Sequence, residues 1–157
     1  MIVAGNLRIG VAGGNVLAMV EFLQLSFGGE TGLGIDGCLA SMMTIPGARR
    51  VTLVDCASGL AVAAAGREDV LDQHEDAAGA TDVVRAVLAS PALSATAAGD
   101  DVEEIIVCGT DGYHLMVLTE ANLDGHLFVH LLLDRETGNI ALARLRMRDL
   151  LGEIAGG

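Results

Sequence analysis

The sequence predicts an α+β fold, a mixed α/β sandwich in which helices cover both faces of a five-stranded antiparallel sheet. Three β-type runs, at residues 103–108, 113–119 and 127–134, are joined by Asp-Gly dipeptides, which favour tight reversals between antiparallel strands. A run with apolar residues at helical spacing follows Asn139, a residue type that commonly caps helix N-termini. With two strands and two helices before this meander, the predicted order is α-β-β-α-β-β-β-α.

The first half of the domain supplies those earlier helices and strands. Apolar residues recur at helical spacing from Ile35, and Pro46 with Gly47 ends that helix. The elements that follow are a strand at about residues 48–54, a turn at residues 55–59, a strand at residues 60–65 and a helix at roughly residues 70–90.

The run at residues 127–134 is predicted to lie in the middle of the sheet. Its Leu and Val residues alternate with Phe128, His130 and Leu132, so both of its faces are mostly apolar. This leaves residues 103–108 as the outer strand, whose apolar side chains need a cover. The final helix carries one apolar stripe, with Arg144 and Arg148 outside it: Ile140, Ala143, Met147, Leu150, Leu151 and Ile154.

Residues 1–34 form a poorly patterned extension, rich in Gly and apolar residues, before a single domain at residues 35–157. The apolar run at residues 9–20 is broken by glycines and is too short for a membrane span. As a secretory signal core it has only one preceding arginine, and as a phosphate loop it lacks the full glycine spacing. A flexible tail or an over-extended start codon is the favoured interpretation.

The charge of the chain argues against nucleic acid as a partner. The 157 residues carry a formal net charge of −12, and no lysine is present. Nucleic-acid binding depends on basic groups that neutralise phosphates. The missing lysine also excludes a standard P-loop and Schiff-base catalysis. The acidic excess favours solubility, and a docking face for a basic partner is the alternative.

The cysteines indicate a reducing compartment. Cys38, Cys56 and Cys108 are widely spaced and form no C-x-x-C motif, so neither a zinc site nor a redox pair is expected. We expect three buried free thiols in the cytoplasm. The abundance of Ala, Gly and Val, with arginine as the sole basic residue besides histidine, is typical of a GC-rich bacterial genome.

No pattern of residues indicates catalysis, a cofactor or a metal. His126 and His130 lie four residues apart on a strand, which places them about 13 Å apart, too far for a common ion. His114, at the start of a strand, is expected to pack. Asp55 and Ser58 lie in a turn, where hydrogen bonds to the backbone account for them. The chain has no G-x-S-x-G or H-E-x-x-H motif, so we expect a protein that is not an enzyme.

The second helix and the outer strand carry the candidate interface. The small residues at 77–80 suit either close packing on the protein's own sheet or a seam between two copies. Valines outside one narrow stripe make this helix apolar on more than one side, which favours a second partner. The candidates are Ala77, Ala80, Val83, Val84, Val87, Leu88, Ile105 and Val107.

Several short motifs share their order and spacing with a known family. They are Val54-Asp55-x-x-Ser58-Gly59, residues 77–86 (AAGATDVVRA), residues 102–107 (VEEIIV), Tyr113-His114-Leu115, and Leu133-Asp134-Arg135 followed by residues 139–144 (NIALAR). Over about residues 35–154 the sequence resembles the Roadblock / dynein-light-chain family, most closely its small stand-alone bacterial members. The resemblance implies a homodimer whose sheets join edge to edge. It also implies a small GTPase partner, because bacterial members often work beside Ras-like GTPases as scaffolds or regulators.

The favoured hypothesis is therefore a cytoplasmic, homodimeric, non-enzymatic scaffold that binds and regulates a Ras-like small GTPase, without a cofactor and without stable membrane insertion. The alternative is a small-ligand sensor with a pocket between the sheet and a helix.

Overall fold

The computed structural model describes residues 2–4, 7–9, 34–66, 73–97, 99–119 and 127–155. Its helices are α2 (Ile35–Met42), α3 (Gln73–Leu88) and α4 (Ile140–Ala155). Its strands are β1 (Ile2–Ala4), β2 (Leu7–Ile9), β3 (Ala48–Asp55), β4 (Leu60–Gly66), β5 (Glu104–Cys108), β6 (Gly112–Leu118) and β7 (Leu127–Asp134).

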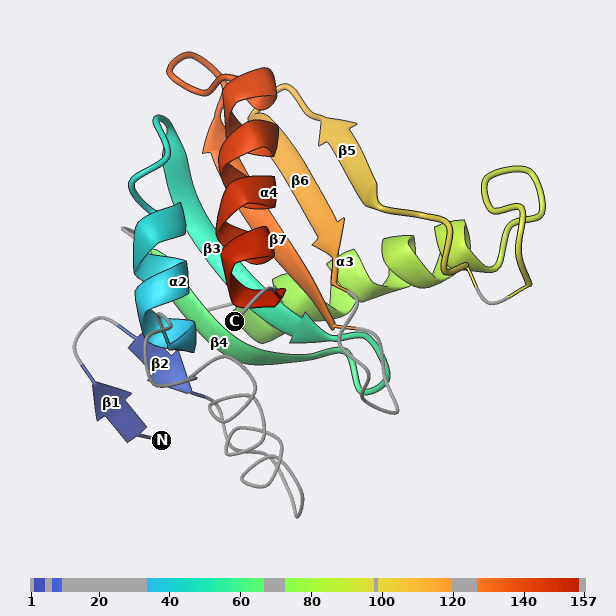
Figure 1. Ribbon diagram of the computed structural model, residues 1–157, viewed down its shortest axis with the longest axis horizontal. Helices are drawn as coiled ribbons and strands as arrows, with labels where there is room; N and C mark the ends of the chain where they lie inside the picture. Colours follow the sequence, from blue (N-terminus) through green and yellow to red (C-terminus); the bar gives the residue numbers. More distant parts are fainter. Residues whose placement is uncertain are drawn as a thin grey trace.

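The strands form one antiparallel sheet in the order β1-β2-β4-β3-β7-β6-β5 (Figure 1). Five of these strands, in the order β4-β3-β7-β6-β5, have helices on both faces of their sheet, which confirms the predicted fold class. The hairpin of β1 and β2 extends this sheet, because Arg8 of β2 pairs with Ala64 of β4. These two strands were not predicted, since three residues are too few to show a period-two alternation. Residues 10–33 of the predicted extension lie outside the described residues.

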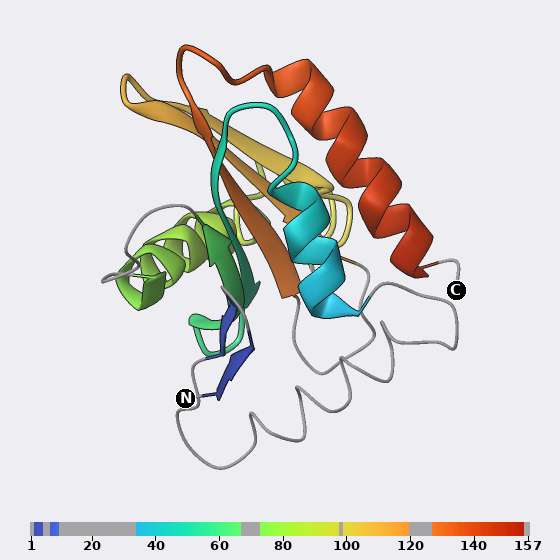
Figure 2. The same cartoon turned by 90° about the vertical axis from the view of Figure 1, so that its left-hand side faces the viewer.

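Helices α2 and α4 cover one face of the sheet, and α3 covers the other (Figures 1 and 2). The alternation along β7 divides its side chains between two cores, as predicted. Leu131 and its like-facing neighbours pack with Met147 under α2 and α4. Phe128 packs with Val54 and Val84 under α3. Phe128, Leu131 and Met147 are fully buried, and burying each such side chain stabilises the fold by about 2 kcal/mol.

Strand β7 lies in the middle of the sheet, which confirms the prediction from its two apolar faces. It pairs with β3 on one side, where Leu131 lies opposite Val51, and with β6 on the other, where it lies opposite Leu115. All three of these side chains are buried. Strand β5 then follows β6 at the edge, as predicted.

Two turns at one end of the sheet are held together tightly. Gly47 precedes β3 with a φ of +83°, and a Cβ built on it would lie 2.6 Å from the Cα of Gly138. The Asp134 N–H donates a hydrogen bond of 2.7 Å to the Gly47 carbonyl. Asn139 then caps α4 as predicted, because its Oδ1 accepts a hydrogen bond of 3.0 Å from the Leu142 N–H. These contacts fix where α4 leaves the sheet.

Candidate interaction surface at the outer strand

Strand β5 presents apolar side chains and unpaired backbone at the edge of the sheet. Among the described residues it pairs with β6 alone. Ile106 is 38% exposed, Val107 is 41% exposed, and Cys108 is also exposed. An exposed apolar edge strand is a surface on which another strand can pair.

The direction of the backbone hydrogen bonds shows which groups of β5 are free. The Glu103 carbonyl accepts a hydrogen bond of 3.0 Å from the Leu118 N–H of β6. The bonding direction alternates along an antiparallel strand, so the odd-numbered residues of this segment face β6. The N–H and C=O groups of Glu104, Ile106 and Cys108 therefore point away from the sheet.

Two arginines of α4 hold the outer strand against the helix. Arg144 forms an ion pair with Glu104, and Arg148 lies 3.3 Å from Glu103 and 3.6 Å from Glu104. The hydrogen bond to Glu104, together with the charges of both glutamates, raises the pKa of Arg144. The Arg148–Glu103 pair is exposed, and such pairs add little stability, so it aligns β5 more than it stabilises the fold. The Glu104 side chain, by contrast, is only 14% exposed.

Helix α3 uses part of its apolar surface to pack on the sheet and leaves the rest accessible. Ala77, Ala80 and Val84 are 1%, 8% and 0% exposed, which places them in the protein's own core. These three candidates are therefore not available to a partner in this conformation. The other five keep accessible surface: Val83 is 40% exposed, Val107 is 41% exposed, and Val87, Leu88 and Ile105 are half-buried.

Arg85 fixes the position of α3 relative to the β3–β4 turn. Its Nη2 donates hydrogen bonds of 2.7 Å to the Cys56 carbonyl and 2.6 Å to the Ala57 carbonyl. Within the same turn, the Ser58 hydroxyl donates a hydrogen bond of 2.6 Å to Asp55, which also accepts from the Ala57 N–H. Asp55 and Ser58 thus form the hydrogen-bonded turn predicted for them.

Two histidines meet on the face of the sheet that carries α3. His114 Nδ1 lies 3.0 Å from His130 Nε2, at hydrogen-bond distance, and the two ring planes are inclined by 26°. His130 is 6% exposed, and burial, followed by the charges of His114 and Arg50, lowers its pKa to about 4. His130 is therefore neutral at pH 7. His126 lies outside the described residues.

The acidic residues that precede β5 have a structural role. Asp101 accepts hydrogen bonds from the Ser94 hydroxyl at 2.6 Å and from the Ala95 N–H at 2.7 Å. The Ser94 hydrogen bond is the main cause that lowers the pKa of Asp101 to about 2. These contacts fold the loop between α3 and β5 and so position the start of the outer strand.

Solved structures similar to this one identify the architecture. No protein-family model and no curated protein match the sequence. MglB from Myxococcus xanthus is 19% identical, with a TM-score of 0.61, over 76% of this chain and 85% of that chain. A Roadblock/LC7 domain from Streptomyces avermitilis is 18% identical, with a TM-score of 0.61, over 78% of this chain and 95% of that chain. An MglB with a tetrameric arrangement is 16% identical, with a TM-score of 0.57, over 94% of this chain and 93% of that chain.

This chain has the Roadblock fold.

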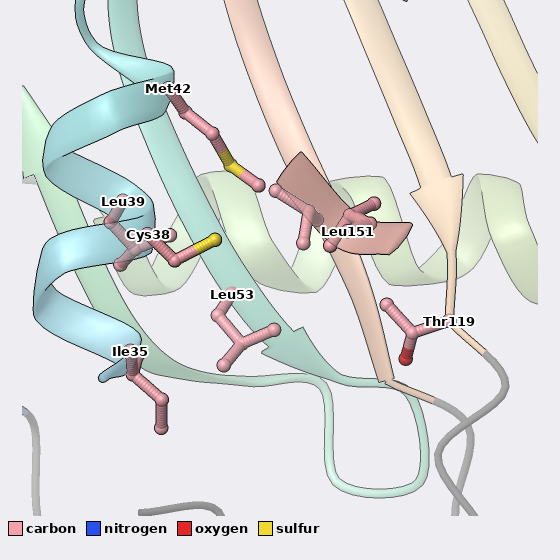
Figure 3. A pocket seen from close by; sticks show the side chains of 8 residues that line it. Ile35, Cys38, Leu39, Met42, Leu53, Thr119 and Leu151 are labelled. Atoms are coloured by element: carbon pink, nitrogen blue, oxygen red, sulfur yellow. The ribbon is translucent and has the colours of Figure 1, made fainter. Parts of the chain in front are cut away.

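A cavity in the described part of this Roadblock fold is too small for a ligand. A cavity of about 20 Å³ lies between α2, α4 and the sheet, lined by apolar side chains such as Cys38, Leu53 and Leu151 (Figure 3). That volume holds a single water molecule, whereas pockets for small molecules reach several hundred Å³. Where the structure is described, this cavity gives the alternative hypothesis of a ligand sensor no support.

The cysteines of this Roadblock fold differ in part from the prediction. Cys38 and Cys56 are buried as expected, and burial raises the pKa of both thiols, that of Cys38 to about 11. Cys108 is exposed, so the expectation of three buried thiols was wrong for this residue. The reason is its place at the end of the uncovered strand β5.

The described residues contain neither a group of three potential metal ligands nor a helix both long and apolar enough to cross a membrane.

The features that could not be predicted from the sequence are contacts between elements that lie far apart along the chain. The histidine pair and the Arg144–Glu104 ion pair join residues that are 16 and 40 positions apart. The period-two alternation places His114 and His130 on one face of the sheet, but their contact also needs the register of β6 and β7.

Proposed function

We propose that this protein is a cytoplasmic, homodimeric, non-enzymatic scaffold that binds and regulates a Ras-like small GTPase. The observation that carries the proposal is the uncovered strand β5 of a Roadblock fold, with exposed apolar side chains on the strand and on α3. The free thiols among the described residues are consistent with a reducing compartment.

Pairing of β5 with its own copy would cover this edge. The outward backbone groups of Glu104, Ile106 and Cys108 then find partners, and Ile106 and Val107 lose contact with water. The fold similarity to an MglB with a tetrameric arrangement supports self-association of this kind of domain. Antiparallel pairing relates the two copies by a twofold axis perpendicular to the sheet, so the same strand serves both chains.

The proposal of a GTPase partner rests on the Roadblock fold and on the resemblance of the sequence to bacterial members of that family. The similarity to MglB supports it at the level of the fold. With a formal net charge of −12, this chain is suited to a partner that presents a basic surface.

Substitution of Ile106 by Pro tests the dimer. Proline removes the outward N–H of this residue and leaves the β5–β6 ladder intact, because residue 106 does not donate to β6. We expect the wild-type protein to elute as a dimer in size-exclusion chromatography with light scattering, and I106P to elute as a folded monomer. The control is I106V, which keeps the N–H and should remain dimeric. A wild-type protein that is monomeric at micromolar concentration contradicts the dimer.

The GTPase partner is tested with purified Ras-like GTPases from the genome that encodes this protein, each loaded with GDP or with a non-hydrolysable GTP analogue. We expect one of them to bind with a nucleotide-dependent affinity in calorimetry. Its hydrolysis rate with and without this protein then separates stimulation from scaffolding. If none binds in either nucleotide state, the GTPase assignment is wrong.

A further inference from the structure

One end of the sheet face that carries α3 has no helical cover among the described residues. Helix α3 crosses behind one end of the strands, and no helix of the described part of the chain lies over the opposite end of the same face (Figure 1). At that end Val107, His114 and Leu132 lie side by side on β5, β6 and β7. Val107 is 41% exposed, and His114 and Leu132 are half-buried. We name these three residues the open row.

The histidine pair connects the open row to the interior. His114 belongs to the open row, and its Nδ1 lies 3.0 Å from Nε2 of His130, which is 6% exposed. A proton bound by this pair therefore places a positive charge partly below the surface, where desolvation makes charge unfavourable. In the monomer, water reaches the exposed part of His114 and can hydrate such a charge.

The charged groups around the pair oppose a further positive charge. From β3, Arg50 is a cation whose charge lowers the pKa of His130. From α3, Asp76 faces this region, but it forms an ion pair with Arg50 and so is already neutralised. From β5, the neighbouring side chains are the apolar Ile105 and Val107. Within one copy, no carboxylate is among the groups that shift the pKa of His130.

A second copy that pairs at β5 would bring its own α3 toward the open row. The twofold axis perpendicular to the sheet keeps both α3 helices on the same face, but it exchanges the two ends of the strands. Helix α3 lies near the end of β5 opposite Val107, and its C-terminal part extends past β5 (Figure 1). The partner's α3 would therefore lie toward the end of β5 that carries Val107, on the side of the open row.

We propose that the pair of His114 and His130 makes self-association of this protein dependent on pH, with the dimer favoured when both imidazoles are neutral. This inference rests on the dimer proposed above and adds its regulation. The partner's α3 removes water from the open row, so a proton on the pair costs more free energy in the dimer than in the monomer. Monomers bind more protons than the dimer does, and the dimer therefore weakens as the pH falls.

The size of the effect follows from the number of protons. If each copy releases up to one proton on association, the dissociation constant rises at most about 100-fold for each unit by which the pH falls. Because the proton on the pair is taken up over only part of the range between pH 7.5 and pH 5.5, we expect a rise of at least about tenfold across that range.

The test is sedimentation equilibrium of the full chain at pH 7.5, 6.5 and 5.5 and constant ionic strength, with circular dichroism to verify that the chain is folded. We expect the dissociation constant of the wild-type protein to rise as stated. H114Q, which keeps a side chain able to hydrogen-bond His130 but does not titrate, should lose most of this dependence. H74Q is the matched control, because His74 is exposed on α3 outside the pair and its removal should leave the dependence unchanged.

The possible outcomes separate the two proposals. A stable dimer whose dissociation constant does not change with pH overturns this inference and leaves the proposed function standing. The same holds if H114Q keeps the pH dependence of the wild type. A protein that is monomeric at every pH overturns both. As a second readout, the NMR titration midpoint of the histidine pair in the wild type should lie at lower pH at concentrations above the dissociation constant, and an unchanged midpoint contradicts the inference.

Discussion

The buried imidazole of His130 couples the stability of the fold to pH. Burial lowers its pKa to about 4, whereas a histidine in the unfolded chain titrates near 6.5. Between these values the unfolded chain binds the proton and the folded chain does not, so the free energy of unfolding falls as the pH falls. The free energy of unfolding falls by about 3 kcal/mol in total between about pH 6.5 and pH 4. Urea unfolding across this range measures it.

A variant without this imidazole identifies the source of the effect. H130L removes the titrating group while filling much of its volume, so its stability should depend less on pH than that of the wild type. H74Q should follow the wild type, because His74 is exposed. If acidification lowered the free energy of unfolding equally in H130L and the wild type, the pH dependence would come from other groups.

Gly47 is required by the backbone at the start of β3. Its φ of +83° disfavours side chains, and a Cβ would lie 2.6 Å from the Cα of Gly138, which is backbone and cannot rotate away. G47A should therefore lower the free energy of unfolding by about 2 kcal/mol or more. In contrast, G152A lies within α4, where a Cβ meets nothing within 4 Å, and should raise it by about 0.5–1 kcal/mol. Thermal unfolding of both variants checks the contrast in sign.

The attachment of β5 to α4 depends on the ion pairs of Arg144 and Arg148 with the two glutamates before and in the strand. R144A should accelerate hydrogen exchange at the β5 amides more than it lowers global stability. The matched control is R146A, since Arg146 is exposed on the same helix. Both arginine substitutions are best made in the I106P variant, because self-association does not then protect the β5 amides from exchange. Equal exchange in R144A and R146A would show that the ion pair does not hold the strand.

The elements that the sequence predicted are those with a strong period. The alternation along 127–134 predicted a central strand with two apolar faces, and β7 has both. Asn139 and the apolar stripe predicted α4 within a residue at its start. By contrast, β1 and β2 gave no signal because each has three residues.

The candidate surface was predicted only in part, for a related reason. The apolar excess on α3 was visible in the sequence, but not which of its residues face the sheet. Ala77 and Ala80 suited an interface and a core equally well, and only their contacts with the protein's own sheet decide for the core. Likewise, the contact between His114 and His130 depends on the register between two strands, which composition does not encode.

The overall charge of the chain works against its own self-association. Two copies with a formal net charge of −12 each repel one another, and the exposed Glu103 lies beside the edge where they are proposed to meet. Salt screens this repulsion, because the Debye length falls from about 10 Å at 0.1 M to about 3 Å at 1 M. We therefore expect the dissociation constant of the dimer to fall several-fold between low and high NaCl concentration at pH 7.5. Ultracentrifugation gives this value directly, and I106P should remain monomeric at every salt concentration. A dimer that weakens with salt would instead indicate ion pairs across the interface, such as Arg148 of one copy with Glu103 of the other, and would contradict an edge held by backbone and apolar contacts.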